Sequence, residues 1–308
     1  MPLALITPFR KDIEIWKKEI LLLDPAMEVY IYPDIPDRTK ITAALLWKQP
    51  ENTFSEFPQL QWVSSLGAGV DHILSDPNLP GHITITRITA HQLAREMARY
   101  IIMGVLNYQK NHIKYVKDQG HKRWQPRPAK EDLCIGLLGL GWLGGHVAKM
   151  LCDLEFEVIG FSTSKKDLPG VITYHGTDQL ENFQAKVDVL INLLPLTPAT
   201  RGILGADFFR KLRKPVYLIN VARGEHLVEK DLLGSLQNGQ LTGALLDTFS
   251  EEPLPEEHPF WTHPKITITP HIASWTDPAT AAEQLVENYH RMCSGKELLN
   301  KIDRNKGY

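Results

Sequence analysis

The stretch Cys134-Ile-Gly-Leu-Leu-Gly-Leu-Gly-Trp-Leu-Gly144 decides the fold. It begins as a short apolar run typical of a buried strand, and it places Gly139, Gly141 and Gly144 in the spacing G-x-G-x-x-G before a helical pattern at 142–154. In this context one glycine makes the tight turn, one lets the backbone approach a pyrophosphate, and one lets helix and strand pack closely. The free amides of the helix then face the anion. The stretch predicts a dinucleotide-binding turn, although glycines also occur at other tight strand-to-helix turns.

Short apolar runs and helical patterns alternate on both sides of this turn. Strand-like runs follow it at 157–161, 187–194, 216–222, 243–248 and 266–269. Earlier runs lie at 3–7, 27–32, 41–47, 62–66 and 83–88. Such alternation is the mark of α/β domains with mostly parallel sheets. The sequence therefore predicts two Rossmann-like or flavodoxin-like domains, with a catalytic cleft between them.

Two longer helical patterns predict the domain boundaries. One covers 91–117, and the other covers 277–294 with Asp277 placed to cap it and Pro278 in its first turn. The residues that could share one face of the first helix are Met97, Ile101, Val105, Tyr108 and His112. Because the first domain ends without a partner for its last elements, we expect the final helix to return to it. The predicted domains are residues 1–94 with 276–308, and residues 95–275, which bind the dinucleotide.

Composition excludes several classes of protein. The 308 residues carry a formal net charge of -2, which gives no electrostatic footprint for nucleic acid. No stretch approaches the ~18 consecutive apolar residues of a membrane span, and the amino terminus does not read as a signal peptide. Three irregularly spaced cysteines fit neither a disulfide framework nor a zinc site. We expect a cytoplasmic protein without a metal.

The segment after the strand at 157–161 indicates which dinucleotide binds. A carboxylate about 20 residues beyond the glycine motif would bind the ribose 2′-hydroxyl of NAD. Here hydroxyl and lysine side chains follow instead, and no acid occurs before Asp167. The residues predicted to hold the 2′-phosphate are Ser162, Thr163, Ser164 and Lys165. The pattern favours NADP(H) as the cofactor, with NAD(H) possible. The alternative interpretation is that these residues form only a polar surface loop.

Three polar residues near strand ends form a candidate catalytic set. Arg223 follows the run at 216–222, Glu252 follows the run at 243–248, and His271 follows the run at 266–269. The ends of parallel strands meet at one edge of a sheet, so these residues can converge. A guanidinium binds a carboxylate with two hydrogen bonds, a histidine transfers a proton, and a carboxylate orients the histidine. This set suits reduction of a 2-keto acid, although each residue alone could be a solvated charge or a structural histidine.

Several motifs resemble those of the D-2-hydroxyacid dehydrogenase family and occur in its order. Besides the glycine motif, these are Leu66-Gly-Ala-Gly-Val-Asp71, Leu193-Leu-Pro-Leu-Thr-Pro-Ala-Thr200, Asn220-Val-Ala-Arg-Gly224, Leu246-Asp-Thr-Phe249 with Glu252-Pro253, and Thr269-Pro-His271. Within the family, Trp47, Trp124-Gln-Pro126 and Pro169-Gly-Val171 are most similar to the glyoxylate/hydroxypyruvate reductases of the A type. The resemblance implies NADPH-dependent reduction of glyoxylate to glycolate and of hydroxypyruvate to glycerate. It leaves a D-lactate or phosphoglycerate type of dehydrogenase, or a dinucleotide-sensing interaction protein, as alternatives.

The resemblance also implies roles for individual residues. Arg223 would bind and polarise the substrate, His271 would be the general acid and base, and Glu252 would be its partner. The backbone of Ala68 and Gly69 would hold the substrate carboxylate, with Trp47 either in the substrate pocket or in the core. The implied cofactor-binding residues beyond the 2′-phosphate loop are Gly139, Gly141, Leu143, Gly144, Leu194, Pro195, Val221, Ala222 and Asp247, the last at the nicotinamide carboxamide. A homodimer is implied, with an arm near 118–132 around Trp124. NADP-preferring relatives tend to carry an arginine where this chain has Thr163, so Lys165 and Lys166 would have to substitute for it as point charges.

Overall fold

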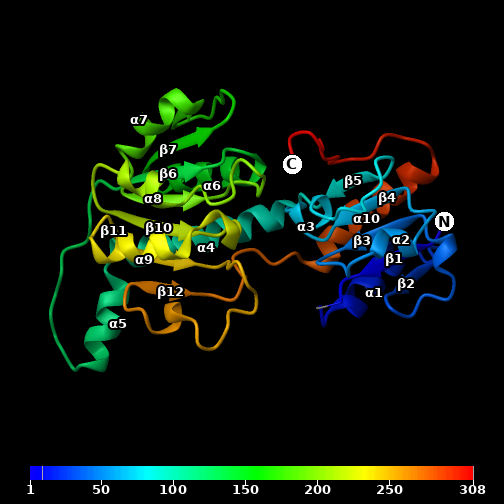
Figure 1. Ribbon diagram of the computed structural model, residues 1–308, viewed down its shortest axis with the longest axis horizontal. Helices are drawn as coiled ribbons and strands as arrows, with labels where there is room; N and C mark the ends of the chain where they lie inside the picture. The colour runs from blue at the N-terminus through cyan, green and yellow to red at the C-terminus, as the bar shows by residue number, and fades with distance from the viewer. Residues whose placement is uncertain (9, 308) are drawn as a thin grey trace. The chain divides into compact units, whose positions relative to one another are not determined.

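The computed structural model describes residues 1–8 and 10–307. Phe9 and Tyr308, the latter at the end of the predicted returning segment, lie outside the described residues. The chain divides into two compact units, of which unit 1 combines residues 1–93 with residues 276–308 and unit 2 covers Ala94–Trp275. Each unit contains its own parallel sheet (Figure 1). The described part of the chain has no helix with the length and apolar character needed to cross a membrane.

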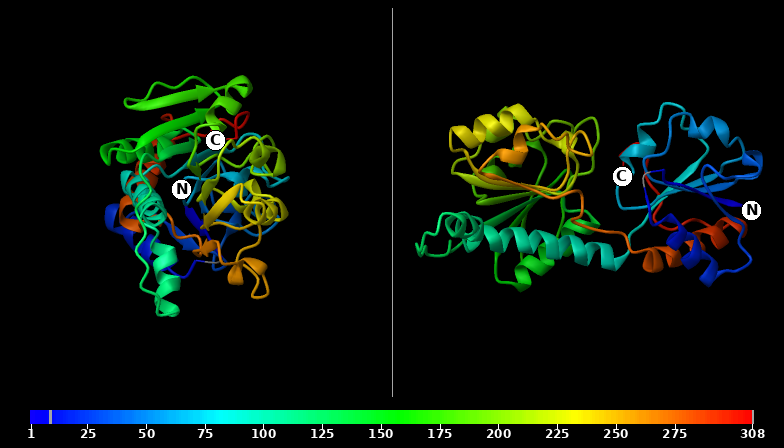
Figure 2. Two further views of the ribbon diagram at one scale, coloured as in Figure 1. Left: turned by 90° about the vertical axis from the view of Figure 1, so that its left-hand side faces the viewer. Right: turned by 90° about the horizontal axis from the view of Figure 1, so that it is seen from below.

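Unit 1 is built on a five-stranded sheet in the order β2-β1-β3-β4-β5. Its strands are β1 (Leu3–Ile6), β2 (Val29–Ile31), β3 (Ala43–Leu46), β4 (Trp62–Ser65) and β5 (Thr84–Arg87), all paired in parallel. Its helices are α1 (Ile13–Leu23), α2 (Thr53–Glu56), α3 (Asp71–Leu74) and α10 (Pro278–Cys293). Helices α1 and α10 cover one face of the sheet, and α2 and α3 cover the other (Figures 1 and 2). The apolar side chains of each helix pair pack against the strands.

The start of α10 follows the predicted cap. The Asp277 side chain accepts a hydrogen bond from the backbone N–H of Thr280 at 3.0 Å, and Pro278 occupies the first turn. At the other end of the helix, the Tyr289 hydroxyl donates to the carbonyl oxygen of Met1 at 2.7 Å. The last helix of the chain therefore completes the core that the first strand begins.

Unit 2 is built on a seven-stranded parallel sheet in the order β12-β11-β10-β9-β6-β7-β8. Its strands are β6 (Cys134–Leu138), β7 (Glu157–Ser162), β8 (Val171–His175), β9 (Val189–Asn192), β10 (Val216–Asn220), β11 (Leu241–Leu246) and β12 (Ile266–Ile268). Its helices are α4 (His91–Gln109, whose first turn crosses from unit 1), α5 (His112–Gly120), α6 (Trp142–Asp153), α7 (Leu180–Gln184), α8 (Ala206–Arg210) and α9 (Glu229–Gln237). In the right-hand view of Figure 2, α9 covers one face of this sheet, and α4 and α6 cover the other.

These two helix-flanked parallel sheets confirm the predicted α/β fold class, while two details of the prediction are wrong. The single helix expected at 91–117 is two helices, because Asn111 adopts a left-handed conformation with φ of 57°. His112, predicted to share one face of that helix with Met97, Ile101, Val105 and Tyr108, lies instead at the start of α5, where it is exposed. Strand β8 was not predicted, since it lies at the sheet edge with none of its residues fully buried.

Candidate active site

The glycine motif forms the turn between β6 and α6. Gly139 has φ of 101°, and a Cβ there would lie 2.8 Å from the carbonyl oxygen of Leu193. A Cβ on Gly144 would lie 2.0 Å from the carbonyl oxygen of Gly139. Gly141 faces open space, with no atom within 4 Å of such a Cβ. The first and third glycines are thus required by close packing, and the middle one leaves room for a pyrophosphate beside the start of α6.

The segment after β7 presents the residues predicted to hold a 2′-phosphate. Ser162, the last residue of β7, is nearly buried, and its hydroxyl donates to the carbonyl oxygen of Ser164 at 2.6 Å. Thr163, Ser164 and Lys165 are exposed. The hydrogen bond of Ser162 therefore fixes this turn, and the hydroxyl groups of Thr163 and Ser164 and the ammonium group of Lys165 are accessible to an anion.

Two buried amide side chains organise the loops that follow β9 and β10. Asn192 and Asn220 end these neighbouring strands in register, and the Nδ2 of Asn192 donates to the Oδ1 of Asn220 at 3.0 Å. Asn220 in turn donates to the carbonyl oxygen of Arg223 at 3.0 Å, and Asn192 accepts from the N–H of Leu194 at 3.2 Å. The remaining predicted cofactor residues lie on these loops and on α6; Leu143, Leu194 and Pro195 are half-buried, and Val221 and Ala222 are buried.

Arg223 lies where the loop after β10 meets the loop after β11. Its side chain is half-buried, and one terminal nitrogen donates to the carbonyl oxygen of Ala222 at 2.7 Å. A Cβ on the next residue, Gly224, would lie only 1.9 Å from the carbonyl carbon of Phe249. The two loops are thus in direct backbone contact, and only glycine fits between them.

The loop after β11 brings Glu252 to His271. The Nδ1 of His271 lies 2.9 and 3.1 Å from the two carboxylate oxygens of Glu252, which also accepts from the backbone N–H of Phe249 at 3.0 Å. The His271 side chain is 30% exposed and the Glu252 side chain 19% exposed. A carboxylate accepts hydrogen bonds, so Nδ1 carries a proton and Nε2 is the nitrogen that can exchange a proton with a ligand.

Asp247 holds the backbone around His271. Its side chain is fully buried, and its two oxygens accept from the Thr269 hydroxyl at 2.6 Å and from the N–H groups of Ile272 and Ala273 at 2.9 and 2.8 Å. Burial is the largest influence on this carboxyl and raises the pKa of Asp247, and the three hydrogen bonds oppose the rise. The Asp247 carboxylate thus stabilises the turn that carries His271. The contact of Asp247 with a nicotinamide, which the family resemblance implies, stays a prediction.

Unit 1 contains the predicted substrate residues Trp47, Ala68 and Gly69. Trp47 follows β3, and its ring packs edge-on against His72 with centroids 5.0 Å apart. Ala68 and Gly69 follow the neighbouring strand β4, and the carbonyl oxygen of Gly69 accepts from the Ser65 hydroxyl at 2.6 Å. A Cβ on Gly67 would lie 3.4 Å from the Trp47 ring, so the structure brings the tryptophan and this loop together.

Comparison with known proteins identifies the family. The model of the D-isomer specific 2-hydroxyacid dehydrogenase NAD binding domain matches residues 102–273. The glyoxylate/hydroxypyruvate reductase A of Yersinia enterocolitica is 41% identical over 272 residues, which cover 86% of this chain and 87% of that protein. The chain belongs to the D-isomer specific 2-hydroxyacid dehydrogenase family. The predicted family is thereby confirmed, and the chain is an NAD(P)-dependent oxidoreductase.

Solved structures of family members superpose on the whole chain. A D-isomer specific 2-hydroxyacid dehydrogenase from Xanthobacter autotrophicus Py2, in complex with NADPH and MES, has a TM-score of 0.94 and 34% identity, covering 100% of this chain and 99% of that one. An NADPH-dependent glyoxylate/hydroxypyruvate reductase from Sinorhizobium meliloti, in complex with NADP and sulfate, has a TM-score of 0.93 and 34% identity with the same coverage.

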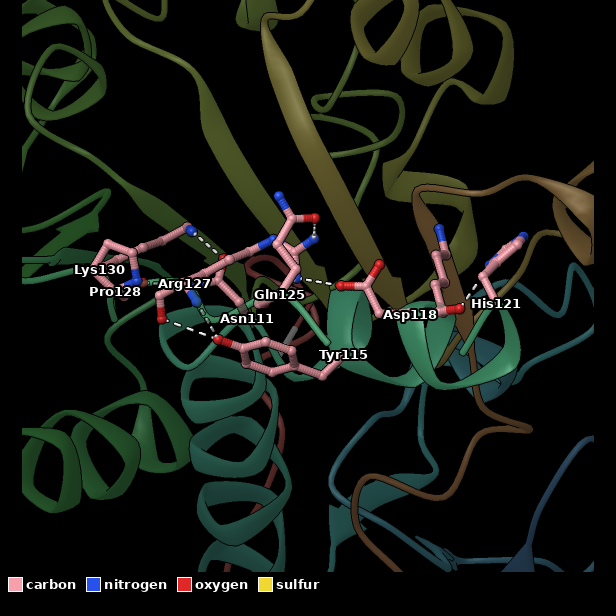
Figure 3. Close-up of polar contacts among 9 residues, drawn as sticks. Asn111, Tyr115, Asp118, His121, Gln125, Arg127, Pro128 and Lys130 are labelled. Atoms are coloured by element: carbon pink, nitrogen blue, oxygen red, sulfur yellow. Dashed lines mark hydrogen bonds and ion pairs between the residues drawn. The ribbon is translucent and has the colours of Figure 1, made fainter. Parts of the chain in front are cut away.

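Of the predicted arm near 118–132, residues 118–120 are the last turn of α5, and the residues from 123 onward form an irregular segment bonded back to α5 and to Asn111 (Figure 3). The Tyr115 hydroxyl donates to the carbonyl oxygen of Arg127 at 3.0 Å, and the Arg127 guanidinium forms an ion pair with Asp118. Asn111 donates to the carbonyl oxygen of Pro128 at 2.8 Å. Trp124 lies in this segment with 99% of its surface exposed.

Sequence reasoning missed the residues that support the predicted site. Asn192 was included in an apolar run without comment, and Asn220 was quoted in a motif without a role of its own. Tyr100, whose hydroxyl bonds to that of Thr269, was included only as part of a helix. A polar amide inside an apolar run is the one signal that could have identified the asparagines. Among residues 1–8 and 10–307, no group of three or more His, Cys, Asp or Glu side chains is arranged to hold a metal ion.

Proposed function

We propose that this protein reduces small 2-keto acids with NADPH, converting glyoxylate to glycolate and hydroxypyruvate to glycerate. The observation that carries the proposal is the pairing of His271 with Glu252 at 2.9 Å, together with the close approach of the Glu252 loop to the Arg223 loop. This is the donor set that the reaction requires, and it lies in the same unit as the dinucleotide turn. The family relatives named glyoxylate/hydroxypyruvate reductase A support this substrate class.

Each residue of the set has a distinct task in this reaction. The guanidinium of Arg223 binds the substrate carboxylate and polarises the adjacent carbonyl group. The Nε2 of His271 donates a proton to the carbonyl oxygen, and Glu252 fixes the ring and compensates the positive charge of the protonated imidazole. A bound nicotinamide supplies the hydride that reaches the carbonyl carbon. In the reverse direction, the same histidine removes the hydroxyl proton.

The residues of unit 2 fit a dinucleotide with a 2′-phosphate. Gly141 leaves the pyrophosphate position open, and the exposed Thr163, Ser164 and Lys165 offer hydrogen-bond donors and a positive charge after β7. A carboxylate in this segment would repel the phosphate by several kcal/mol at an effective dielectric constant of about 20. We therefore assign NADP(H) as the preferred cofactor and NAD(H) as a poorer one, which agrees with the NADPH and NADP bound in the two similar structures.

We extend the proposal to a cytoplasmic homodimer joined through the arm. Hydrogen bonds between Tyr115 and Arg127 hold the segment that carries Trp124 to its own chain (Figure 3). The exposed indole of Trp124 is therefore accessible without a partner having to order the segment. Met103 and Leu106 of α4 and Val116 of α5 are also exposed apolar residues in unit 2. Exposed apolar surface of this kind is typical of an interface between subunits.

The test is the rate of NADPH loss with glyoxylate, hydroxypyruvate, pyruvate and oxaloacetate, repeated with NADH. Rapid turnover of the first two, faster with NADPH, is the expected result. The variant His271→Gln should lose most of this turnover and bind NADPH normally, as measured by the fluorescence of the bound nucleotide. Preference for pyruvate would indicate a D-lactate type of dehydrogenase. NADPH binding without any turnover would contradict the proposal and favour a dinucleotide sensor.

A further inference from the structure

The backbone of the proposed acid and base is in an unusual conformation. His271 has φ of 55°, in the left-handed region that residues other than glycine seldom occupy. Such a conformation persists only where neighbouring groups impose it. The N–H of His271 donates to the carbonyl oxygens of Asp247 at 2.8 Å and of Thr269 at 3.1 Å. The position of the imidazole therefore depends on what fixes these two residues.

The Asp247 carboxylate accepts hydrogen bonds from residues on both sides of His271 in this turn. It accepts from Ile272 and Ala273, the two residues after the histidine, and from the hydroxyl of Thr269, two residues before it. All three donors lie on a single loop, and the carboxylate lies at the end of the neighbouring strand β11. Any shift of Thr269 is thus transmitted through Asp247 to both sides of His271.

A side chain from outside the loop, that of Tyr100, adds a further hydrogen bond to this group of residues. Tyr100 of α4 lies 169 residues away in the chain, and its hydroxyl is hydrogen-bonded to the hydroxyl of Thr269. Thr269 has one hydroxyl proton and gives it to Asp247, so the Tyr100 hydroxyl must be the donor to Thr269. Burial raises the pKa of Tyr100, so this hydroxyl keeps its proton. The three residues form a chain of hydrogen bonds with a single direction, from Tyr100 through Thr269 to Asp247.

We propose that Tyr100 is a positioning residue for catalysis, whose hydroxyl acts through Thr269 and Asp247 to hold His271 in its left-handed turn. The inference rests on the proposed function, because it assumes that His271 transfers the proton. Tyr100 itself contacts neither Glu252 nor Arg223 in any hydrogen bond of the described structure. Its contribution should therefore appear in the rate of the chemical step and not in binding.

The first experiment compares Tyr100→Phe with Tyr108→Phe. Tyr108 is another tyrosine of α4, half-buried where Tyr100 is buried. Its hydroxyl accepts from Thr242 at the start of β11, away from the histidine loop. We expect Tyr100→Phe to lower kcat for glyoxylate about tenfold, with the KM for glyoxylate and the Kd for NADPH changed less than twofold. Tyr108→Phe should leave all three constants unchanged. Thermal unfolding of both variants measures the loss of stability that any missing hydroxyl causes.

The second experiment tests whether the effect runs through Thr269. Thr269→Ser keeps the hydroxyl and should keep near-normal kcat, whereas Thr269→Val should lower kcat at least as much as Tyr100→Phe. The double variant Tyr100→Phe/Thr269→Val should be no slower than Thr269→Val, because the chain is already broken. Losses that multiply in the double variant would overturn the inference.

The outcomes separate this inference from the proposed function. If wild-type protein turns over no keto acid, or if His271→Gln remains active, the proposed function fails and the inference fails with it. If wild-type protein is active and His271→Gln is not, but Tyr100→Phe has the same kcat as Tyr108→Phe, only the role of Tyr100 is overturned.

Discussion

The contact between the Arg223 loop and the Glu252 loop should make Gly224→Ala severely damaging. The added Cβ would lie 1.9 Å from the carbonyl carbon of Phe249 and 2.1 Å from the nitrogen of Ser250, whereas ordinary contact begins at 3.4 Å. Because both neighbours are backbone atoms, the loops must separate by roughly 1.5 Å, the difference between 3.4 and 1.9 Å. Misplacement of catalytic groups by about 1 Å can cost ~100-fold in rate. Overpacking should also cost about 1–3 kcal/mol in the free energy of unfolding.

The measurements are kcat with glyoxylate and NADPH, and the midpoint of thermal unfolding. We expect Gly224→Ala to lower kcat about 100-fold and the midpoint by about 2–4 °C for each kcal/mol of stability lost. Gly234→Ala is the matched control, since Gly234 is exposed in α9 and no atom lies within 4 Å of its Cβ. That variant should be fully active and more stable by about 0.5–1 kcal/mol. If Gly224→Ala retained kcat within about threefold and melted normally, the argument from close backbone contact would be refuted.

Three further predictions concern the cofactor, the last helix and the arm. Lys165→Glu should raise the KM for NADPH at least about tenfold and the KM for NADH less than about twofold, since a carboxylate repels only the 2′-phosphate; equal effects in steady-state kinetics would remove Lys165 from the cofactor site. Asp277→Ala should lower the free energy of unfolding by about 1 kcal/mol at neutral pH. The bond to Thr280 lowers the pKa of Asp277 below its ordinary value of 3.8, so the cap stabilises above that value and is lost as the pH falls through the folded-state pKa. Urea titrations of the two proteins should therefore converge at acid pH, and a constant gap would argue against an ionised cap. Trp124→Ala should shift sedimentation velocity profiles towards monomer, and an unchanged dimer would exclude the arm from the interface.

The sequence predicts the architecture well wherever a strand is buried. Runs such as β6 and β10 are rich in apolar residues because helices cover both faces of the sheet, and this composition is visible without a structure. Edge strand β8, Val-Ile-Thr-Tyr-His, has residues of high β propensity, but none of them is fully buried. It was missed because the prediction relied on continuous apolar runs, which mark buried strands and not half-exposed edge strands. The break at Asn111 is equally invisible, because asparagine adopts the left-handed conformation only where the surroundings, here its bond to Pro128, favour it.

For the candidate site, the sequence predicts which residue types take part and in which order they occur along the chain. Arg223, Glu252 and His271 stand near strand ends, and parallel strands direct their ends to one edge of the sheet. The supporting residues were not predictable in the same way. Tyr100 meets Thr269 only because α4 packs on a particular stretch of the sheet, and a pairing across 169 residues leaves no trace in spacing or periodicity.

The arrangement of unit 1 has a consequence for how the chain matures on the ribosome. Its first strand emerges early in synthesis, yet the helix that covers its core, α10, emerges last, and the bond between Tyr289 and Met1 spans 288 residues. Contacts this distant in the chain are slow to form, because a long loop must close first. Unit 2 is contiguous in the chain, whereas the two separated parts of unit 1 can join only after all of unit 2 has been synthesised. During that interval the apolar side chains of unit 1 that pack against α10 lack this cover, and exposed apolar surface of this kind favours aggregation.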